Sequence, residues 1–427
     1  MTSAPPSRPA TWKWLVCGLL LLASAINYMD RQTLANASVR ISREFGLSQA
    51  QYGNVEAVFG YAFAAGSVVF GFLADRMSVR WLYAWVLALW SVAGFVTGFV
   101  KNYDQLLLCR ALLGFFEAGH WPCAIRTTRM LLDERQRSMG NGLLQSGASL
   151  GAVITPAIMA ALMTADVATW RTPFLVVGAV GMVWLVPWCV LLRGNDLRAD
   201  TEGRGRGAAA EELGENAARA PRPPRASFWS IVFSRRMLVV FFVVACINTT
   251  WQILRAWMPK FLQEGRGYTE GQALAFNSAW FIATDLGCLA AGALAVWLAR
   301  RHLSVHAARV IVFAGCAALC AACALVPRLG SGWPLLVVLA LAGAGALGVF
   351  PLYHAFTQDI SAEHQGKITG LAGVAAWVMP AQLQRLFGVL ADRTGSFDLG
   401  LALAGLLPLL AVLPLWLLWK TPKTSAP

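Results

Sequence analysis

Long apolar stretches separated by short polar segments recur along the whole chain. Twelve of these stretches are about as long as a bilayer-spanning helix requires, which is roughly 20 mostly apolar residues. They cover residues 14–36, 52–74, 81–100, 105–128, 139–163, 171–192, 237–262, 271–299, 306–326, 333–357, 367–390 and 398–419. Their length and their content of Ala, Leu, Gly and Val predict helices, because the strands of a membrane barrel alternate over about ten residues.

The longest polar interruption, residues 193–236, divides the stretches into two groups of six. Its Arg, Glu, Gly, Ala and Pro cannot bury a core, which predicts a flexible linker with some helix around Ala208–Glu215. We therefore expect an all-α integral membrane protein with an N-terminal six-helix bundle (1–192), a cytoplasmic linker (193–236) and a C-terminal six-helix bundle (237–427).

Composition agrees with a chain that lies mainly in lipid. It is 57% hydrophobic and only 13% charged, whereas soluble domains carry about 25% charged residues. A soluble enzyme, a secreted disulfide scaffold and a disordered protein are thereby disfavoured. Nine cysteines do not alter this, because Cys320 and Cys323 form their CxxC in an apolar run, where buried small residues are expected rather than a redox or zinc site.

The net charge of +13 is mainly a signal of topology. Loops that alternate with the predicted helices place 22 Lys and Arg on the side of both termini and the linker, and 8 on the other side. The positive-inside rule makes the richer side cytoplasmic, with both termini inside. Lys13 and Ala23-Ser24-Ala25 also resemble a signal peptide, but the apolar helix continues past the supposed cleavage site.

Ionisable side chains within the predicted helices are the main functional signal, since each is costly in lipid unless it is paired or lines a watery cavity. Asp30 and Arg31 lie in the first helix, and Arg110 and Glu117 lie in the fourth. A spacing of seven residues places Arg110 and Glu117 on one helix face. The four groups form either a structural salt-bridge cluster or a proton-coupling site beside an anion-binding site.

Further polar groups are candidates for binding an anion. Arg255 can grip a carboxylate with two hydrogen bonds, or it can reach toward the membrane interface, and we leave both open. Tyr61, Gln145 and Trp377 either contact a hydroxylated ligand or only pack between helices. Asn248 and Trp251 are also predicted to bind the substrate. Further polar or ring-bearing residues of the second half are Thr249, Gln252, Trp257, Asp285 and His354. Glu56 stays unassigned, and the five histidines show no metal-ligand spacing.

The segment between the second and third stretches resembles the loop signature of the major facilitator superfamily. It keeps Gly71, Asp75, Arg76 and Arg80, and it has Ser78 where a second glycine is usual. Six plus six helices and a long central linker fit the same superfamily. The resemblance implies a conformational role for this loop and two bundles related by a pseudo-twofold axis, with the site at midplane.

Two further motifs resemble the anion:cation symporter family, which includes bacterial hexuronate, galactonate and glucarate transporters. They are Asn27-Tyr28-Met29-Asp30-Arg31 and Arg110-x₃-Gly114-x₂-Glu117-Ala118-x₃-Pro122, and Thr284-Asp285-Leu286-Gly287-Cys288 is similar to hexuronate transporters. The resemblance implies that Asp30 and Glu117 couple protons, that Arg110 pairs with these acids, and that Arg31 binds the substrate carboxylate, with Tyr28 beside it. Arg255 and His354 are not standard in sugar-acid transporters and leave a different organic anion open.

These observations predict a secondary active transporter that carries a small organic anion, most simply a sugar acid such as a hexuronate or aldonate, into the cytoplasm with protons. An antiporter or efflux pump of the same fold, sodium coupling, a non-sugar anion and a sensor remain alternatives. A membrane enzyme is disfavoured because no extramembrane segment offers a catalytic set. We expect a monomer in the bacterial inner membrane, in contact with lipids, without nucleic-acid partners and without a cofactor other than the coupling ion.

Overall fold

The structure, a computed structural model, describes residues 10–193, 196–197, 230, 232–301, 303–358, 360 and 365–419. These residues form helices and no strands. The first group is α1 (Ala10–Phe45), α2 (Gln49–Arg76), α3 (Val79–Thr97), α4 (Tyr103–Glu117), α5 (His120–Leu131), α6 (Glu134–Leu162) and α7 (Arg171–Leu191). The second group is α10 (Arg235–Lys260), α11 (Glu270–Arg300), α12 (Val305–Ala321), α13 (Trp333–Gln358), α14 (Gln365–Thr394) and α15 (Asp398–Leu417).

Short turns of tighter or wider helix extend some of these elements. They are η1 (Val167–Trp170) before α7, η3 (Phe261–Gly265) after α10 and η4 (Ala322–Arg328) after α12. Each of the twelve predicted stretches coincides with a helix of the structure, and the fourth coincides with the pair α4 and α5. The predicted linker, its expected helix at Ala208–Glu215 and the two chain ends lie almost entirely outside the described residues.

Ten described helical segments are long and apolar enough to cross a membrane. The fourth predicted stretch is absent from these ten because its helix is broken into two short pieces. α14 also falls short, since Gln382, Gln384 and Arg385 interrupt its apolar sequence. The ten segments that qualify nevertheless indicate a multi-pass membrane protein.

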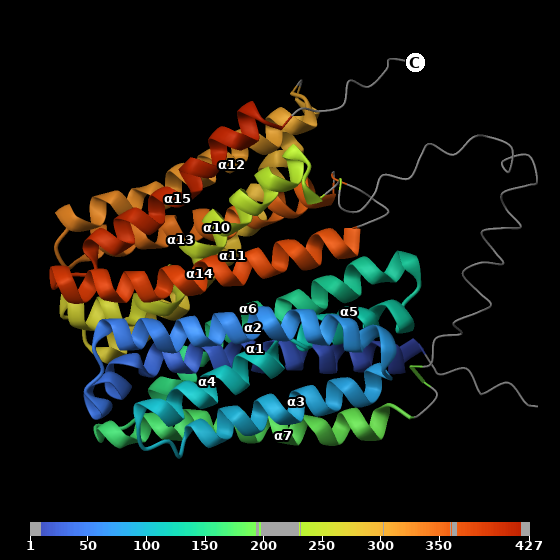
Figure 1. Cartoon of the computed structure of the whole chain (residues 1–427), viewed down its shortest axis with the longest axis horizontal. Coiled ribbons are helices and arrows are strands. Elements are labelled where there is room, and N and C mark those ends of the chain that lie inside the picture. The colour runs from blue at the N-terminus through green and yellow to red at the C-terminus, as the bar shows by residue number, and fades with distance from the viewer. Residues whose placement is uncertain are drawn as a thin grey trace, which may run out of the picture.

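The helices associate in two groups (Figure 1). Helices α1 to α7 pack together in one half of the molecule and α10 to α15 in the other. The halves meet where α14 packs on α2, α11 on α6 and α10 on α1.

Glycines let several of these helices approach to backbone contact. A Cβ atom on Gly147 would lie 2.1 Å from the carbonyl oxygen of Leu21, and one on Gly151 would lie 2.2 Å from that of Ala25. These two glycines therefore let α6 pack closely against α1.

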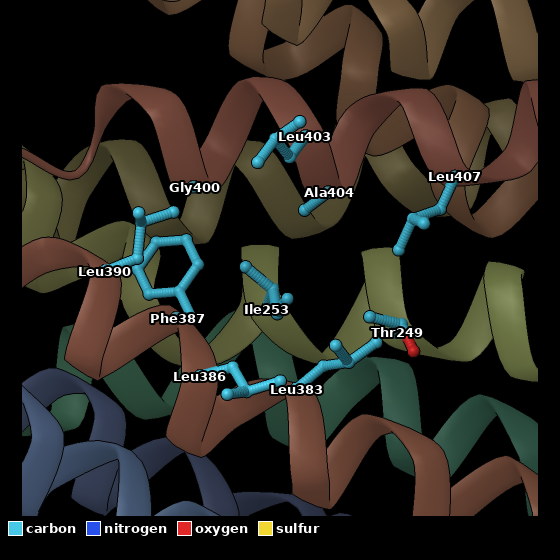
Figure 2. Close-up of a pocket in the computed structure, with 10 residues that line it drawn as sticks. All are labelled: Thr249, Ile253, Leu383, Leu386, Phe387, Leu390, Gly400, Leu403, Ala404 and Leu407. Carbon is cyan, nitrogen blue, oxygen red and sulfur yellow. The ribbon is translucent and has the colours of Figure 1, made fainter.

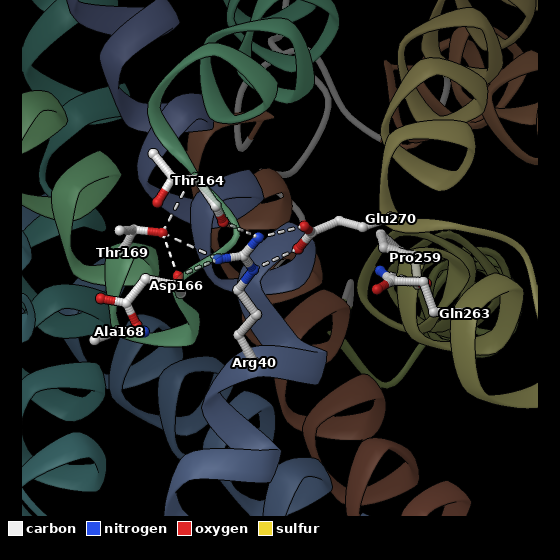
Figure 3. A network of polar contacts seen from close by, with 8 residues as sticks. All are labelled: Arg40, Thr164, Asp166, Ala168, Thr169, Pro259, Gln263 and Glu270. Atoms are coloured by element: carbon white, nitrogen blue, oxygen red, sulfur yellow. Dashed lines mark hydrogen bonds and ion pairs between the residues drawn. The ribbon is translucent and has the colours of Figure 1, made fainter.

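One end of the molecule, which we call the Arg40 side, is closed by polar contacts between the two halves. Arg40 donates to both carboxylate oxygens of Glu270 at 2.8 and 2.6 Å. The same guanidinium donates to the carbonyls of Asp166 and Thr164 and to the hydroxyl of Thr169 (Figure 3). This one side chain thus ties α1, the connection before α7 and the start of α11 together.

A second contact on the Arg40 side caps one half with a residue of the other. Asp392 of α14 accepts hydrogen bonds from the backbone N–H groups of Gln49 and Ala50, at 2.9 and 2.8 Å. These donors lie in the first turn of α2, where a helix leaves N–H groups without an internal partner. Lys260 adds a 2.5 Å hydrogen bond to Ser42.

The opposite end, which we call the Asp75 side, lacks such contacts among the described residues. The hydrogen bonds between the halves that lie furthest toward this side join Tyr61 to Gln382 and Ser149 to Asp285. The described halves are therefore tied at the Arg40 side and midway along α2 and α6.

Candidate functional site

The fourth membrane span is interrupted in the interior of the protein. α4 ends at Glu117, and α5 begins at His120 after Ala118 and Gly119. Pro122 has no N–H group to donate to the carbonyl of Ala118, and its ring disfavours a continuous helix at that point. The break places Glu117 on the last turn of α4, fully buried.

Glu117 is held by an arginine from the first helix. Arg31 donates from Nε to Oε2 of Glu117 at 3.0 Å and from NH2 to Oδ1 of Asn27 at 2.9 Å. Arg31 is only 4% exposed. Oε1 of Glu117 has no hydrogen-bond partner among the described groups. The ion pair therefore joins α1 to α4 and leaves one carboxylate oxygen unused.

Aromatic rings surround the guanidinium of Arg31. Its central carbon lies 4.9 to 5.5 Å from the ring centroids of Tyr28, Phe59, Phe63 and Trp377. Cation–π attraction of this kind is worth about 1 to 2 kcal/mol when the groups are desolvated. The rings of α2 and α14 therefore hold Arg31 in place without occupying its hydrogen-bonding nitrogens.

Asp30 and Arg110 are buried near this pair, and several of their polar side-chain atoms lack a hydrogen-bond partner among the described groups. No described group hydrogen-bonds Oδ2 of Asp30 or any of the three guanidinium nitrogens of Arg110. Arg110 lies 4.5 Å above the ring of Phe59 and is within electrostatic range of Glu117 and Asp30. The expected ion pair between Arg110 and the acids is therefore absent as a direct contact, because the Phe59 ring lies against its guanidinium and Arg31 occupies Glu117.

A second buried ion pair joins the two halves. NH2 of Arg255 donates to Oε2 of Glu56 at 2.8 Å, and its Nε donates to Gln252 at 2.8 Å. The two charged side chains are 2% and 1% exposed, so the alternative in which Arg255 reaches the membrane surface is wrong. Sequence reasoning left Glu56 unassigned, because its position near the start of α2 gave no sign of the arginine that meets it.

Six buried charges therefore lie close together: the acids Asp30, Glu56 and Glu117, and the bases Arg31, Arg110 and Arg255. Their formal charges cancel. A cavity of about 10 Å³, the room of a single water molecule, lies beside them and is lined by Glu56, Arg255, Phe59 and Trp377 among others.

Some of the other residues predicted to bind the substrate lie beside this cluster, and others lie elsewhere. Trp377 and Tyr28 surround Arg31. Tyr61 instead donates to Gln382 of α14, which is the helix-to-helix alternative. Asn248 donates to the carbonyl of Val244 in its own helix, and Trp251 stacks on Trp280. Gln145 is exposed on α6, away from this cluster's hydrogen bonds.

The predicted conformational loop lies at the Asp75 side. Gly71, Asp75 and Arg76 belong to the last turns of α2, whereas Arg80 lies in the first turn of α3. Asp75 pairs with Arg126 of α5 at 3.6 Å, and Arg80 donates to the carbonyl of Cys189 in α7. These contacts stay within the first half of the molecule.

His120 is a buried polar residue whose role sequence reasoning missed. Its two ring nitrogens lie 3.0 Å from the hydroxyl of Ser24 and 2.8 Å from that of Tyr83. In the sequence, the one indication of this role is that His120 directly follows Ala118 and Gly119, where the helix breaks. Within the described ranges, no group of three or more His, Cys, Asp or Glu side chains could hold a metal ion.

An apolar groove of about 160 Å³ lies between α10, α14 and α15 (Figure 2). Its lining is almost wholly hydrocarbon, with Thr249 as the one residue bearing a side-chain hydroxyl. It offers no group that would bind an anion and is separate from the charged cluster.

Comparison with known families places the chain. The model of the Major Facilitator Superfamily matches residues 20–381. The chain belongs to this superfamily. The resemblance drawn from the loop and helix motifs is therefore confirmed, and the protein is a membrane transporter rather than an enzyme.

Similar proteins are named as transporters of organic anions. The "Probable sulfoacetate transporter SauU" of Cupriavidus necator is 28% identical, covering 92% of this chain and 90% of its own length. The "D-galactonate transporter" of Escherichia coli is 27% identical over 71% of both chains. The "Hexuronate transporter" of Escherichia coli is 22% identical over 95% of this chain and 93% of its own.

Solved structures share the fold. A bacterial homologue of the lysosomal transporter Spinster superposes with a TM-score of 0.72 at 15% identity, covering 96% of this chain and 97% of its own. The D-xylose-proton symporter superposes with a TM-score of 0.71 at 14% identity, covering 96% and 98%. These likenesses confirm the all-α major facilitator fold.

Proposed function

We propose that the protein imports a small organic anion, with sugar acids as the leading class, together with protons. The observation that carries this proposal is the contact between Arg31 and Glu117, in which a potential anion-binding guanidinium is held by a buried carboxylate. Relatives named for sulfoacetate, galactonate and hexuronate support an anionic substrate.

The chemistry of the contact couples two events. While Glu117 is ionised, it occupies the Nε edge of Arg31. A proton on Glu117 removes its charge and weakens the pair, so that the guanidinium can grip a substrate carboxylate with two hydrogen bonds. Asp30 lies within electrostatic range of both groups and offers a second site for a proton. Release of the substrate lets the carboxylates lose their protons and pair again.

We propose that transport proceeds by alternating access, with the closed Arg40 side as one of its two states. The excess of Lys and Arg at the Asp75 side makes that side cytoplasmic, so this conformation is closed toward the outside. Opening requires the contacts of Arg40 and Asp392 to break. The inward proton gradient would drive the anion that moves with the protons, and the membrane potential adds about 2.3 kcal/mol per 100 mV only for each net positive charge carried inward.

Counterflow of labelled sugar acids in proteoliposomes tests this function. We expect galactonate, glucuronate or galactarate to exchange, and an inward proton gradient to drive accumulation while a sodium gradient does not. Accumulation driven by a sodium gradient alone would show that the coupling ion is sodium and not the proton. Export of the anion driven by inward proton flow would favour an antiporter. Binding of the anion without flux would favour a sensor.

A further inference from the structure

Arg255 is a second buried guanidinium beside the rings that surround Arg31. Phe59 and Trp377 lie against Arg31, and the same two side chains line the small cavity at Arg255. Arg255 comes from the second half of the molecule and Arg31 from the first. One small molecule at these rings would therefore meet a cation on each side of the interface between the halves.

The pair of Arg255 and Glu56 is incomplete. NH1 of Arg255 and Oε1 of Glu56 are buried, and no described group hydrogen-bonds either atom. A buried pair of this kind repays its desolvation only when its remaining hydrogen-bonding positions are filled. The unused positions indicate a pair that serves for more than holding two helices together.

We propose that the transported substrate is a small dianion, with one charged group bound by Arg31 and the other by Arg255. This inference rests on the proposed function and narrows its substrate class. Glu56 then acts at Arg255 as Glu117 acts at Arg31: it holds the guanidinium when the site is empty and gives it up when it takes a proton.

Charge balance supports two protons for each dianion. In the empty site, three carboxylates offset three guanidinium groups. A dianion that takes Arg31 and Arg255 leaves Glu117 and Glu56 without partners, and a buried carboxylate without a partner is costly. Two protons neutralise them, so the occupied site is again neutral overall. Asp30 and Arg110 offset each other in this count, and a proton on Asp30 in place of Glu117 would leave the total unchanged.

The surroundings of Glu56 allow this exchange. The charged or titratable groups near it are Arg255 on α10, Arg110 on α4 and Tyr52 on its own helix. α14 presents only Trp377, Pro380, Ala381 and Gln384 to the cavity, none of which ionises. At about 10 Å³ the cavity admits water but no organic anion, so the substrate enters Arg255's side only when α14 moves away from α2.

Matched anions distinguish this inference from the broader function. Counterflow is measured with galactarate, a dianion, against galactonate, which has the same carbon skeleton and one carboxylate. The variants are the double exchange Glu56→Gln with Arg255→Gln, which keeps the site neutral, Glu56→Gln alone, and Arg31→Gln as the control that should weaken both substrates.

We expect the wild-type protein to prefer galactarate by ten- to hundredfold, the range of a charged hydrogen-bonded contact. The double variant should lose this preference and still exchange galactonate. Equal use of both anions by the wild-type protein would overturn the inference and leave the proposed function intact. The same holds for a folded double variant that keeps the preference or loses both anions equally. Exchange of neither anion by the wild-type protein overturns both.

A binding measurement guards against a double variant that does not fold. Thermal melting of purified wild-type protein and Glu56→Gln is compared with and without galactarate and sulfoacetate. Because the single variant leaves Arg255 unpaired, we expect both dianions to bind it at neutral pH at least tenfold more tightly than they bind the wild-type protein. Unchanged affinity would show that Glu56 does not compete for Arg255.

Discussion

Arg31 of α1 and Glu117 of α4 share a hydrogen bond of 3.0 Å, although the two residues are 86 positions apart in the chain. The contact uses Nε, which belongs to one of the two edges through which a guanidinium can bind a carboxylate with two hydrogen bonds. An anionic substrate and an ionised Glu117 therefore compete for the same edge. This competition is the physical basis of the first two predictions.

Replacing Glu117 with Gln should separate exchange from accumulation. The amide keeps the shape of the side chain but can neither carry nor lose a proton. We expect counterflow of galactonate to persist, while accumulation driven by an inward proton gradient falls to the level of facilitated diffusion. Both are measured in proteoliposomes, with Glu44→Gln as a matched change in an acid on the same half. Undiminished accumulation by Glu117→Gln would refute the assignment.

Replacing Arg31 with Ala should weaken substrate binding. Loss of a charged, hydrogen-bonded partner costs about 1.5 to 3 kcal/mol, which corresponds to a rise in the half-saturating concentration of roughly ten- to hundredfold. Arg31→Lys should be almost as damaging, because an ammonium cannot bind a carboxylate bidentately. If either variant leaves substrate affinity unchanged, Arg31 does not bind the anion.

Breaking the contact between Arg40 and Glu270 should favour opening at the Arg40 side. Glu270→Gln removes the charge that holds α11 to α1, an effect of about 1 kcal/mol for a partly exposed pair. We expect a cysteine placed at Ser42 to react several times faster with a water-soluble maleimide in this variant.

The ion pair of Arg171 and Glu44 supplies the control for that measurement. It has similar exposure on the same side, but it joins α7 to α1 within one half. Glu44→Gln should leave the reactivity at Ser42 unchanged. Equal increases in both variants would point to general loosening of the surface instead of opening.

Replacing Gly147 with Val should destabilise the first half. A side chain there would collide with the carbonyl of Leu21, and overpacking of this kind costs about 1 to 3 kcal/mol or more. Gly18→Ala is the control, since no atom lies within 4 Å of a Cβ at that position. We expect thermal melting in detergent to fall by several degrees for the first variant only. An unchanged melting temperature for Gly147→Val would show that α1 and α6 can separate without cost.

The helices were predictable because hydrophobic length sets the number of membrane crossings. The break after Glu117 was not predicted, although Gly119 and Pro122 carry its cause. Local sequence shows that proline disfavours a helix, but surrounding helices decide whether the chain bends, breaks or continues.

The charged residues of the site were recognisable one by one, but their pairing was not. Asp30, Arg31, Arg110 and Glu117 stand out because charge is rare in apolar helices. Glu56 and Arg255 are 199 residues apart, and neither position shows that the two meet. The position of Tyr61 was equally ambiguous, since a tyrosine on α2 can face a cavity or a neighbouring helix. Such outcomes depend on the rotation of packed helices about their axes, which a single sequence leaves undetermined.

The cap that Asp392 provides to α2 has a consequence for how the Arg40 side opens. Separation of the halves removes the acceptor from the N–H groups of Gln49 and Ala50 at the moment the helices part. Hydrocarbon cannot replace a carboxylate there, whereas water can. We therefore expect water to enter first at the surface of the Arg40 side. The contacts between the halves would then break in order from the surface inward, each one being hydrated before the next one breaks. Access to the substrate site from this side would then be controlled by the advance of water rather than by the swing of a single rigid gate.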